Sequence, residues 1–213
     1  GFLAGLAEEG IVEGENLTVE YQNAQADTSM ATTIASNFVA NGYDLICAIA
    51  TPMAVCAYNA AEDAIPVIYT AVSAPEEAGL TDGGNVTGTS DALNTNFIMD
   101  MMFAQNPNTA KVGLLYSLSE PNSAKPIADA KAYLDTKGIE YVEQTANTND
   151  EVVAAASALI AAGVDAVFTP TDNVIMAAEL AIYEDLAKNG IPHYTGACLL
   201  YTSDAADDLI GVD

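Results

Sequence analysis

The chain repeats itself, and this repeat constrains the fold more than any other feature of the sequence. Residues 35–55, ASNFVANGYDLICAIATPMAV, align with residues 156–176, ASALIAAGVDAVFTPTDNVIM. A second pair follows, in which IPVIYTA at 65–71 is matched by IPHYTGA at 191–197. Each match runs through whole strand–helix units, so the sequence predicts two similar α/β lobes. Chance similarity between alanine-rich helices is the competing interpretation.

Strand-like and helix-like segments alternate along the whole chain. The predicted strands are Asn16–Gln22, Asp44–Ile49, Ile65–Tyr69, Val86–Thr89, Lys111–Tyr116, Glu140–Gln144, Ala166–Thr169 and Pro192–Thr195. The predicted helices are Gly1–Glu9, Ser29–Ala40, Pro52–Glu62, Asn94–Ala104, Ser123–Lys137, Asp150–Ala161 and Val174–Ala187. Alternation of this kind favours parallel sheets covered by helices.

The charge of the chain excludes several classes of function. Its 213 residues contain 30 Asp and Glu against five Lys and Arg, all of them lysines, and the formal net charge is −25. A nucleic-acid-binding protein needs a basic surface, so we expect no nucleic-acid partner. Neither a dinucleotide-binding nor a P-loop glycine motif is present. No apolar run reaches about 18 residues, so no membrane span is predicted.

Cysteine and histidine give no sign of metal or redox chemistry. Cys47, Cys56 and Cys198 lack zinc-type spacing, and we interpret them as buried free thiols. The single histidine, His193, lies in a strand-like segment and is expected to be structural. We therefore expect no metal, no cofactor and no catalytic residue.

Polar residues follow equivalent strands in the two halves of the repeat. Thr51-Pro52 and Asp172-Asn173 each come directly after a predicted strand. In open α/β sheets, ligands bind at the carboxyl ends of the strands. Two lobes that face one another would present both edges to one cleft.

Four segments resemble the substrate-binding proteins of ABC transporters, in particular the group with tryptophan- and phenylalanine-binding members. The segments are IPVIYTAVSAPEEAGL (65–80), NVTGTSD (85–91), YSLSEPNSAKPIADAKAYLDTKGIE (116–140) and VFTPTDNVI (167–175). The resemblance implies an α/β, type I periplasmic-binding-protein fold with two Rossmann-like lobes, parallel sheets, a hinge and a ligand between the lobes. The N-terminal lobe would comprise residues 1–90 and the C-terminal lobe residues 91–197.

Both ends of the chain depart from the family pattern. The family begins with a strand that precedes the first helix here, so this chain is expected to be truncated, with the first strand and a signal or lipoprotein segment upstream. At the other end, residues 198–213, CLLYTSDAADDLIGVD, resemble translated sequencing-adapter sequence. We expect Cys198–Asp213 to be a non-native tail.

The resemblance implies a free amino acid or a related compound as ligand, and such a zwitterion needs two opposite poles in the protein. Without arginine, the ligand carboxylate must be met by hydroxyl groups and helix N-termini. We expect Thr51 and Ser73 to bind it, with Asn122 and Ser123 closing from the other lobe.

The ligand ammonium group needs a carboxylate, and Asp172 is the candidate, with Asn173 beside it. The alternative is that Asp172 caps the following helix, and both roles can hold together. Tyr69 and Tyr116 end strands at the same edge and either line the side-chain pocket or pack in the core.

A hinge is expected where the chain passes between the lobes. Gly88 would give backbone freedom there, and Thr89, Ser90 and Asp91 would lie at the crossing. The alternative is an ordinary glycine-containing loop. Hinge closure would bury the ligand and change the surface shown to a transporter.

These expectations favour the extracytoplasmic binding component of an ABC importer, working as a monomer with a membrane permease. One alternative is an α/β enzyme acting on a small polar metabolite, which product formation would reveal. Another is the ligand-sensing core of a transcription regulator, which would need a basic DNA-binding segment upstream.

Overall fold

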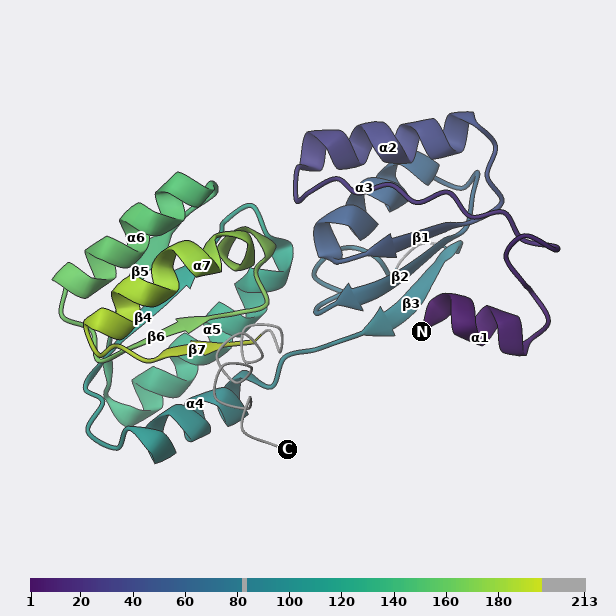
Figure 1. Cartoon of the computed structure of the whole chain (residues 1–213). Coiled ribbons are helices and arrows are strands. Elements are labelled where there is room, and N and C mark those ends of the chain that lie inside the picture. The colour runs from purple at the N-terminus through teal and green to yellow at the C-terminus, as the bar shows by residue number, and fades with distance from the viewer. Residues whose placement is uncertain (82–83, 197–213) are drawn as a thin grey trace, which may run out of the picture.

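The computed structural model describes residues 1–81 and 84–196, and it contains two α/β lobes (Figure 1). The tail expected at 198–213, including Cys198, lies outside the described residues. The first lobe has a parallel sheet in the order β1-β2-β3. Its elements are α1 (Phe2–Glu8), α2 (Thr28–Ala40), β1 (Ile46–Ile49), α3 (Thr51–Ala61), β2 (Val67–Val72) and β3 (Val86–Ser90).

The second lobe has a four-stranded parallel sheet in the order β5-β4-β6-β7. Its elements are α4 (Thr95–Gln105), β4 (Lys111–Tyr116), α5 (Pro121–Lys137), β5 (Glu140–Thr145), α6 (Asn149–Ala161), β6 (Ala166–Thr169), α7 (Asn173–Lys188) and β7 (His193–Thr195). The predicted fold class, two lobes with parallel sheets, is therefore confirmed.

The sequence repeat is also a structural repeat. In the alignment of the two halves, α2 corresponds to α6, β1 to β6 and α3 to α7. The second matched pair places β2 opposite β7. The helix N-caps agree with this correspondence, because Asp27 caps α2 and Thr148 caps α6 through side-chain oxygens.

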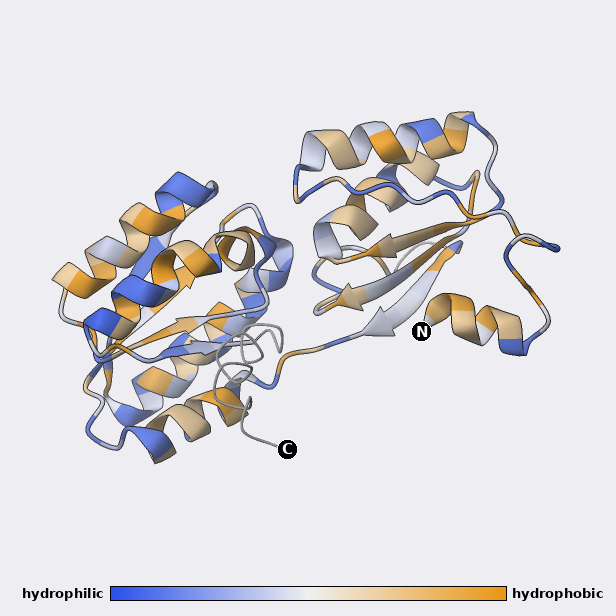
Figure 2. Cartoon of the chain, in the orientation of Figure 1, coloured by the Kyte–Doolittle hydropathy of each residue, from blue (hydrophilic) through white to orange (hydrophobic). Residues whose placement is uncertain are grey.

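The two lobes differ in how many faces of the sheet carry a core. In the second lobe, α6 and α7 pack one apolar cluster against the sheet, and α4 and α5 pack another. The described part of the first lobe has one such cluster, under α2 and α3. Its remaining helix, α1, lies on the other side of the sheet (Figure 1) and is largely apolar (Figure 2), yet it has no buried residue.

Two sequence predictions fail in the first lobe. Asn16–Gln22, predicted as a strand, forms no strand beyond an isolated bridge between Leu17 and Glu13, because no strand pairs with the rest of it. Cys47, predicted to be buried, is exposed, because among the described residues no helix covers its face of β1; Cys56 is half-buried.

The chain passes from one sheet to the other between Ser90, the end of β3, and Thr95, the start of α4. Gly88 lies within β3 and against Tyr69, where a Cβ atom would overlap the Tyr69 carbonyl and ring. The glycine is therefore required for close packing, which differs from the backbone freedom expected from the sequence. Among the described residues, no helix is long and apolar enough to cross a membrane.

Candidate functional site

Helices begin at the carboxyl ends of strands in both lobes, and polar side chains gather at these starts. Helix α3 begins at Thr51, directly after β1, and the preceding residue Ala50 has φ of 76°. Such a backbone conformation is costly for a residue with a side chain and tends to occur at functional sites. Thr51 is 1% exposed, and its Oγ1 has no hydrogen-bond partner among the described residues. This buried hydroxyl is free to bind a ligand.

Asp172 lies at the matching position of the second lobe and is completely buried. Its Oδ1 accepts hydrogen bonds from the backbone N–H groups of Val174 and Ile175, each at 3.1 Å, and so caps α7. Its Oδ2 accepts from the Ser117 backbone N–H and from Ser123 Oγ, both at 2.7 Å. The capping interpretation is thus realised, and the carboxylate also joins β4, α5 and α7.

Glu120 is a second buried carboxylate in this edge, and the sequence analysis did not single it out. It is 5% exposed, and its Oε2 accepts a 2.7 Å hydrogen bond from Asn173 Nδ2. Burial raises the pKa of Glu120; the nearby Asp172 charge adds to this, and the Asn173 amide opposes it. The hydrogen-bond partners of Asp172 and Glu120 include no lysine among the described residues. Because buried negative charge is costly without a positive partner, the two carboxylates favour a cationic group of a ligand beside them.

Asn122 and Ser123 open α5 and are both buried. Asn122 Nδ2 donates to the Thr171 carbonyl, while Asn122 Oδ1 has no partner among the described residues. Ser123 Oγ is already engaged with Asp172. Asn122 thus adds a second unpartnered polar atom, and it comes from the lobe opposite Thr51.

The remaining predicted binding residues are placed differently. Ser73 is 8% exposed and directly follows β2. Tyr69 packs in the first-lobe core. The Tyr116 hydroxyl donates a 2.8 Å hydrogen bond to Glu143, whose Oε2 also pairs with Lys131. Burial and then the Glu143 carboxylate raise the pKa of Tyr116 to about 12. The Tyr116 hydroxyl is therefore committed to this network.

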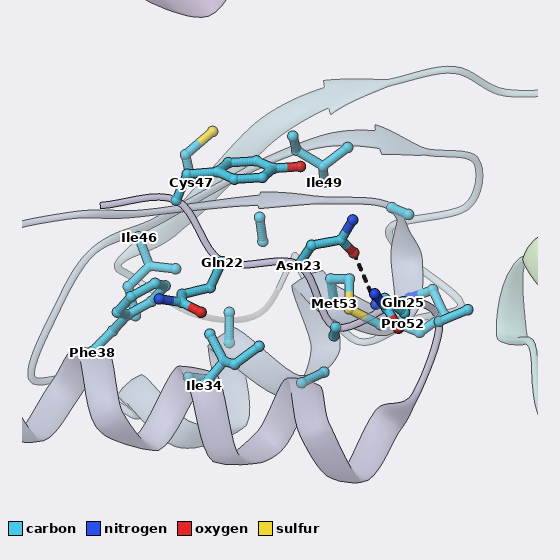
Figure 3. Close-up of a pocket in the computed structure, with 18 of the residues that line it drawn as sticks. Gln22, Asn23, Gln25, Ile34, Phe38, Ile46, Cys47, Ile49, Pro52 and Met53 are labelled. Carbon is cyan, nitrogen blue, oxygen red and sulfur yellow. Dashed lines mark hydrogen bonds between the residues drawn. The ribbon is translucent and has the colours of Figure 1, made fainter. Parts of the chain in front are cut away.

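A cavity of about 320 Å³ lies in the first lobe (Figure 3). Its lining comes from residues 20–26, α2, β1, the start of α3, and Glu120 and Asn173 of the other lobe. Figure 3 shows Ile34 and Phe38 rising from α2 toward Ile46. Helices α3 and α5 also contact each other across the lobes. Of the eight predicted binding residues, Asn173 alone lines this cavity.

Glu120 escaped the sequence analysis because a Glu before a Pro at the start of a helix is typical of an exposed turn. Its burial depends on Asn173, 53 residues further along the chain. The available signal was its place between β4 and α5, since that edge is where the other candidates lie.

Comparison with known proteins agrees with this architecture. A family model described as ABC transporter substrate binding protein matches residues 1–198. The chain is 39% identical over 197 residues to a protein named tyrosine-binding protein from Clostridioides difficile (strain R20291), covering 90% of this chain and 56% of that protein. The chain therefore spans little more than half the length of this relative.

Two solved structures are also similar. A domain from Streptococcus pneumonia in complex with L-Trp matches with a TM-score of 0.87 and 32% identity, over 92% of this chain and 68% of that one. A ligand-free, open substrate-binding protein with adhesive properties from Clostridium difficile matches with a TM-score of 0.60 and 32% identity, over 100% of this chain and 79% of that one.

Proposed function

Because the chain belongs to the family of ABC transporter substrate-binding proteins, we propose that it holds an amino acid between its two lobes and delivers it to an importer. The observation that carries this proposal is the pair of buried, unpartnered polar atoms, Thr51 Oγ1 and Asn122 Oδ1, at helix starts of opposite lobes. Buried polar atoms are costly unless they find partners, so they favour a polar ligand between them.

The ligand carboxylate is placed on the first lobe. Thr51 and Ser73 follow adjacent strands β1 and β2, and the N-terminus of α3 adds partial positive charge. Asn122, with Ser123 beside it at the start of α5, closes from the second lobe.

The ligand ammonium group is placed at the two carboxylates of the second lobe. Asp172 is fully buried, and its carboxylate accepts hydrogen bonds from four donors. It therefore attracts the ammonium group through its negative charge without a direct hydrogen bond. Glu120 is 5% exposed and lines the cavity that Asp172 does not reach, and Asn173 donates a hydrogen bond to its Oε2. The direct ammonium contact is therefore assigned to Glu120.

The names of the relatives support an aromatic amino acid as the ligand, and the structural overlay supports a closed arrangement of the lobes. The named relatives bind tyrosine and L-Trp. At equal sequence identity, the structure also overlays better on the L-Trp complex than on the ligand-free, open protein. A closed arrangement of the lobes fits this difference.

The remaining parts of the proposal concern the whole protein. It acts outside the cytoplasm, anchored as a lipoprotein or free, and docks as a monomer on a membrane permease. Its role is binding without catalysis, so the amino acid is released unchanged.

Titration calorimetry with L-tyrosine, L-tryptophan, L-phenylalanine and L-leucine tests the proposal. We expect the aromatic amino acids to bind, and Thr51→Ala to weaken binding at least tenfold, because its hydroxyl is the buried donor at α3. Thr33→Ala is the matched control, since Thr33 is exposed on α2 and bonds its own helix. Absence of heat with every amino acid, equal affinity of the two variants, or recovery of a chemically altered ligand would overturn it.

A further inference from the structure

The loop that joins β4 to α5, residues 117–120, lies at the centre of the second lobe's strand edge. Strand β4 has β5 on one side and β6 on the other, and the loop is bonded to the chain beyond both. The Ser117 N–H donates to Asp172 Oδ2 at 2.7 Å, beyond β6. Ser117 Oγ donates to Asn147 Oδ1 at 3.0 Å, beyond β5. The loop is therefore held from two sides at the edge where the proposed site lies.

The polar groups on either side of Leu118 are engaged within the lobe. The Ser119 N–H donates to Ser117 Oγ at 3.1 Å, and the hydroxyl oxygens of these two serines lie 2.7 Å apart. Ser117 is 1% exposed and Glu120 is 5% exposed, and Asn173 donates to Glu120 Oε2. Hydrogen bonds therefore fix the chain both before and after Leu118.

The Leu118 side chain itself is 72% exposed to solvent. The other large apolar residues that are exposed in the described part of this lobe lie on α4 and α7, and they are Phe97, Leu180 and Tyr183. An exposed leucine gains free energy when an apolar group covers it. Because the neighbours of Leu118 are already ordered, little conformational entropy is lost when this happens. The loop is thus preorganised to receive an apolar group.

The place of Leu118 in the chain indicates which group covers it. Leu118 comes two residues before Glu120, which is assigned to the ligand ammonium group, and Asn122 follows at the start of α5. In an α-amino acid, the ammonium group, the carboxylate and the side chain all branch from one carbon atom. A protein group beside the contacts for the charged groups is therefore within reach of the ligand side chain.

We propose that Leu118 forms an apolar wall against which the side chain of the bound amino acid packs. It thereby favours ligands with a large apolar or aromatic side chain over ligands with a small one. The inference rests on the proposed amino-acid site and adds to it a residue that determines specificity. The buried polar atoms of that site fix the charged groups common to all amino acids, and Leu118 distinguishes one amino acid from another.

Titration calorimetry with L-phenylalanine and L-alanine tests this role, because the two ligands share their charged groups and differ by the ring. The matched variants are Leu118→Ala and Leu180→Ala, since Leu180 is a leucine of the same lobe that is 82% exposed on α7. Leu118→Ala should weaken binding of L-phenylalanine at least about fivefold and of L-alanine less than about twofold, because the apolar contact is lost with the larger ligand alone. Leu180→Ala should leave both affinities unchanged.

Methyl NMR of leucine-labelled protein gives a second, direct readout. The Leu118 methyl signals are those that disappear in Leu118→Ala. They should shift upfield when L-phenylalanine binds, because an aromatic ring shields protons above its face, while the Leu180 signals stay in place. Where the parent protein binds L-alanine too weakly for titration, this shift decides the question.

Three results separate the proposal from its rivals. Equal weakening of both ligands by Leu118→Ala would overturn it, because Leu118 would then act in closure of the lobes. Unchanged affinities together with unshifted Leu118 methyl signals would also overturn it and would leave the side chain for a contact with the transporter. Failure of the parent protein to bind any amino acid would refute the proposed function itself, and the titration of the parent protein tells this failure from the other two.

Discussion

Phe168 and Cys47 hold matched positions in the two lobes, on strands β6 and β1, and their surroundings are opposite. The Phe168 side chain is completely buried under the helices α4 and α5. Cys47 is exposed, as is its neighbour on the same face, Ile49, at 55%. The same strand–helix unit therefore forms a core on one face or on two, depending on what the neighbouring chain supplies.

This difference concerns stability as much as shape. A parallel sheet is normally covered on both faces, and a strand with an open edge is prone to pairing with other chains. In the second lobe, the central strands β4 and β6 are buried and helices cover both faces of the sheet. In the described part of the first lobe, helices form a core on one face of the sheet only. We therefore expect the second lobe to supply most of the resistance to unfolding.

The largest expected effect comes from truncating the matched residues. Phe168→Ala should cost about 3–5 kcal/mol of unfolding free energy, because it leaves a large cavity in a packed core. Cys47→Ala should change stability by less than about 0.5 kcal/mol, because its side chain is exposed. Urea unfolding followed by far-UV circular dichroism measures both. Losses of similar size would contradict the contrast between the lobes.

The second contrast is between Asp172 and Thr51, which occupy matched helix starts. Asp172→Ala should cost about 2–4 kcal/mol, since it removes a helix cap and leaves the Ser117 N–H and the Ser123 hydroxyl unpaired. Thr51→Ala should cost at most about 1 kcal/mol, because removal of the buried, unpartnered hydroxyl offsets the loss of one buried methyl group.

Melting curves and ligand titrations on the same two variants separate stability from binding. Thr51→Ala should weaken ligand binding while the melting temperature falls much less than in Asp172→Ala. If Asp172→Ala melted like the parent protein, the four hydrogen bonds at its carboxylate would not be holding the site together.

Most of the fold was predictable because its signals are local. The apolar runs, the helical periodicity and the repeat each lie within a short stretch of sequence, and they predicted the two parallel sheets correctly. The failure at Asn16–Gln22 has a non-local cause: its alternation is typical of a strand, but a strand exists only where another strand pairs with it.

The candidate site was less predictable than the fold. The carboxyl ends of strands indicated Thr51, Asp172 and Asn173 because that rule depends on chain order. It could not indicate which polar atoms are already paired, as at Asp172, or that Glu120 is buried. Both facts depend on contacts about 50 residues apart in the chain.

Three hydrogen-bonded polar side chains, Thr169, His193 and Glu179, lie in the second lobe, and the position matched to His193 in the first lobe is apolar. Thr169 Oγ1 lies 2.8 Å from His193 Nε2, and His193 Nδ1 lies 2.9 Å from Glu179 Oε1. The residue matched to His193 in the first lobe is Val67, which is fully buried. His193→Val should therefore cost about 1–3 kcal/mol, because it leaves the Glu179 carboxylate buried without its partner.

The control for this prediction is the double variant Glu179→Leu, His193→Val, which imitates the apolar first lobe. Replacing both partners of a buried polar pair by apolar groups is often neutral, so the double variant should recover most of the loss. If thermal unfolding showed the double variant to be no more stable than His193→Val alone, the pairing would not explain the effect.

The smallest expected effect is a pH dependence at Glu120, the second buried carboxylate of the second lobe's strand edge. Burial raises its pKa above the ordinary value of 4.5, so the folded state holds the Glu120 proton more tightly than the unfolded state does. Its contribution to stability is therefore fully present below about pH 4.5 and is lost as the pH rises through the raised pKa. Glu120→Gln, which cannot ionise, should be free of this loss.

The stability of Glu120→Gln relative to the parent protein should consequently increase from about pH 4.5 toward neutrality, in urea unfolding at a series of pH values. The same variant should bind the amino acid more weakly at neutral pH, because it lacks the negative charge assigned to the ligand ammonium group. A pH-independent difference in stability would show that Glu120 is not desolvated in the folded protein. Stability gained together with unchanged binding would instead place the ammonium group elsewhere, and the second lobe would then resemble the first in offering the ligand neutral groups alone.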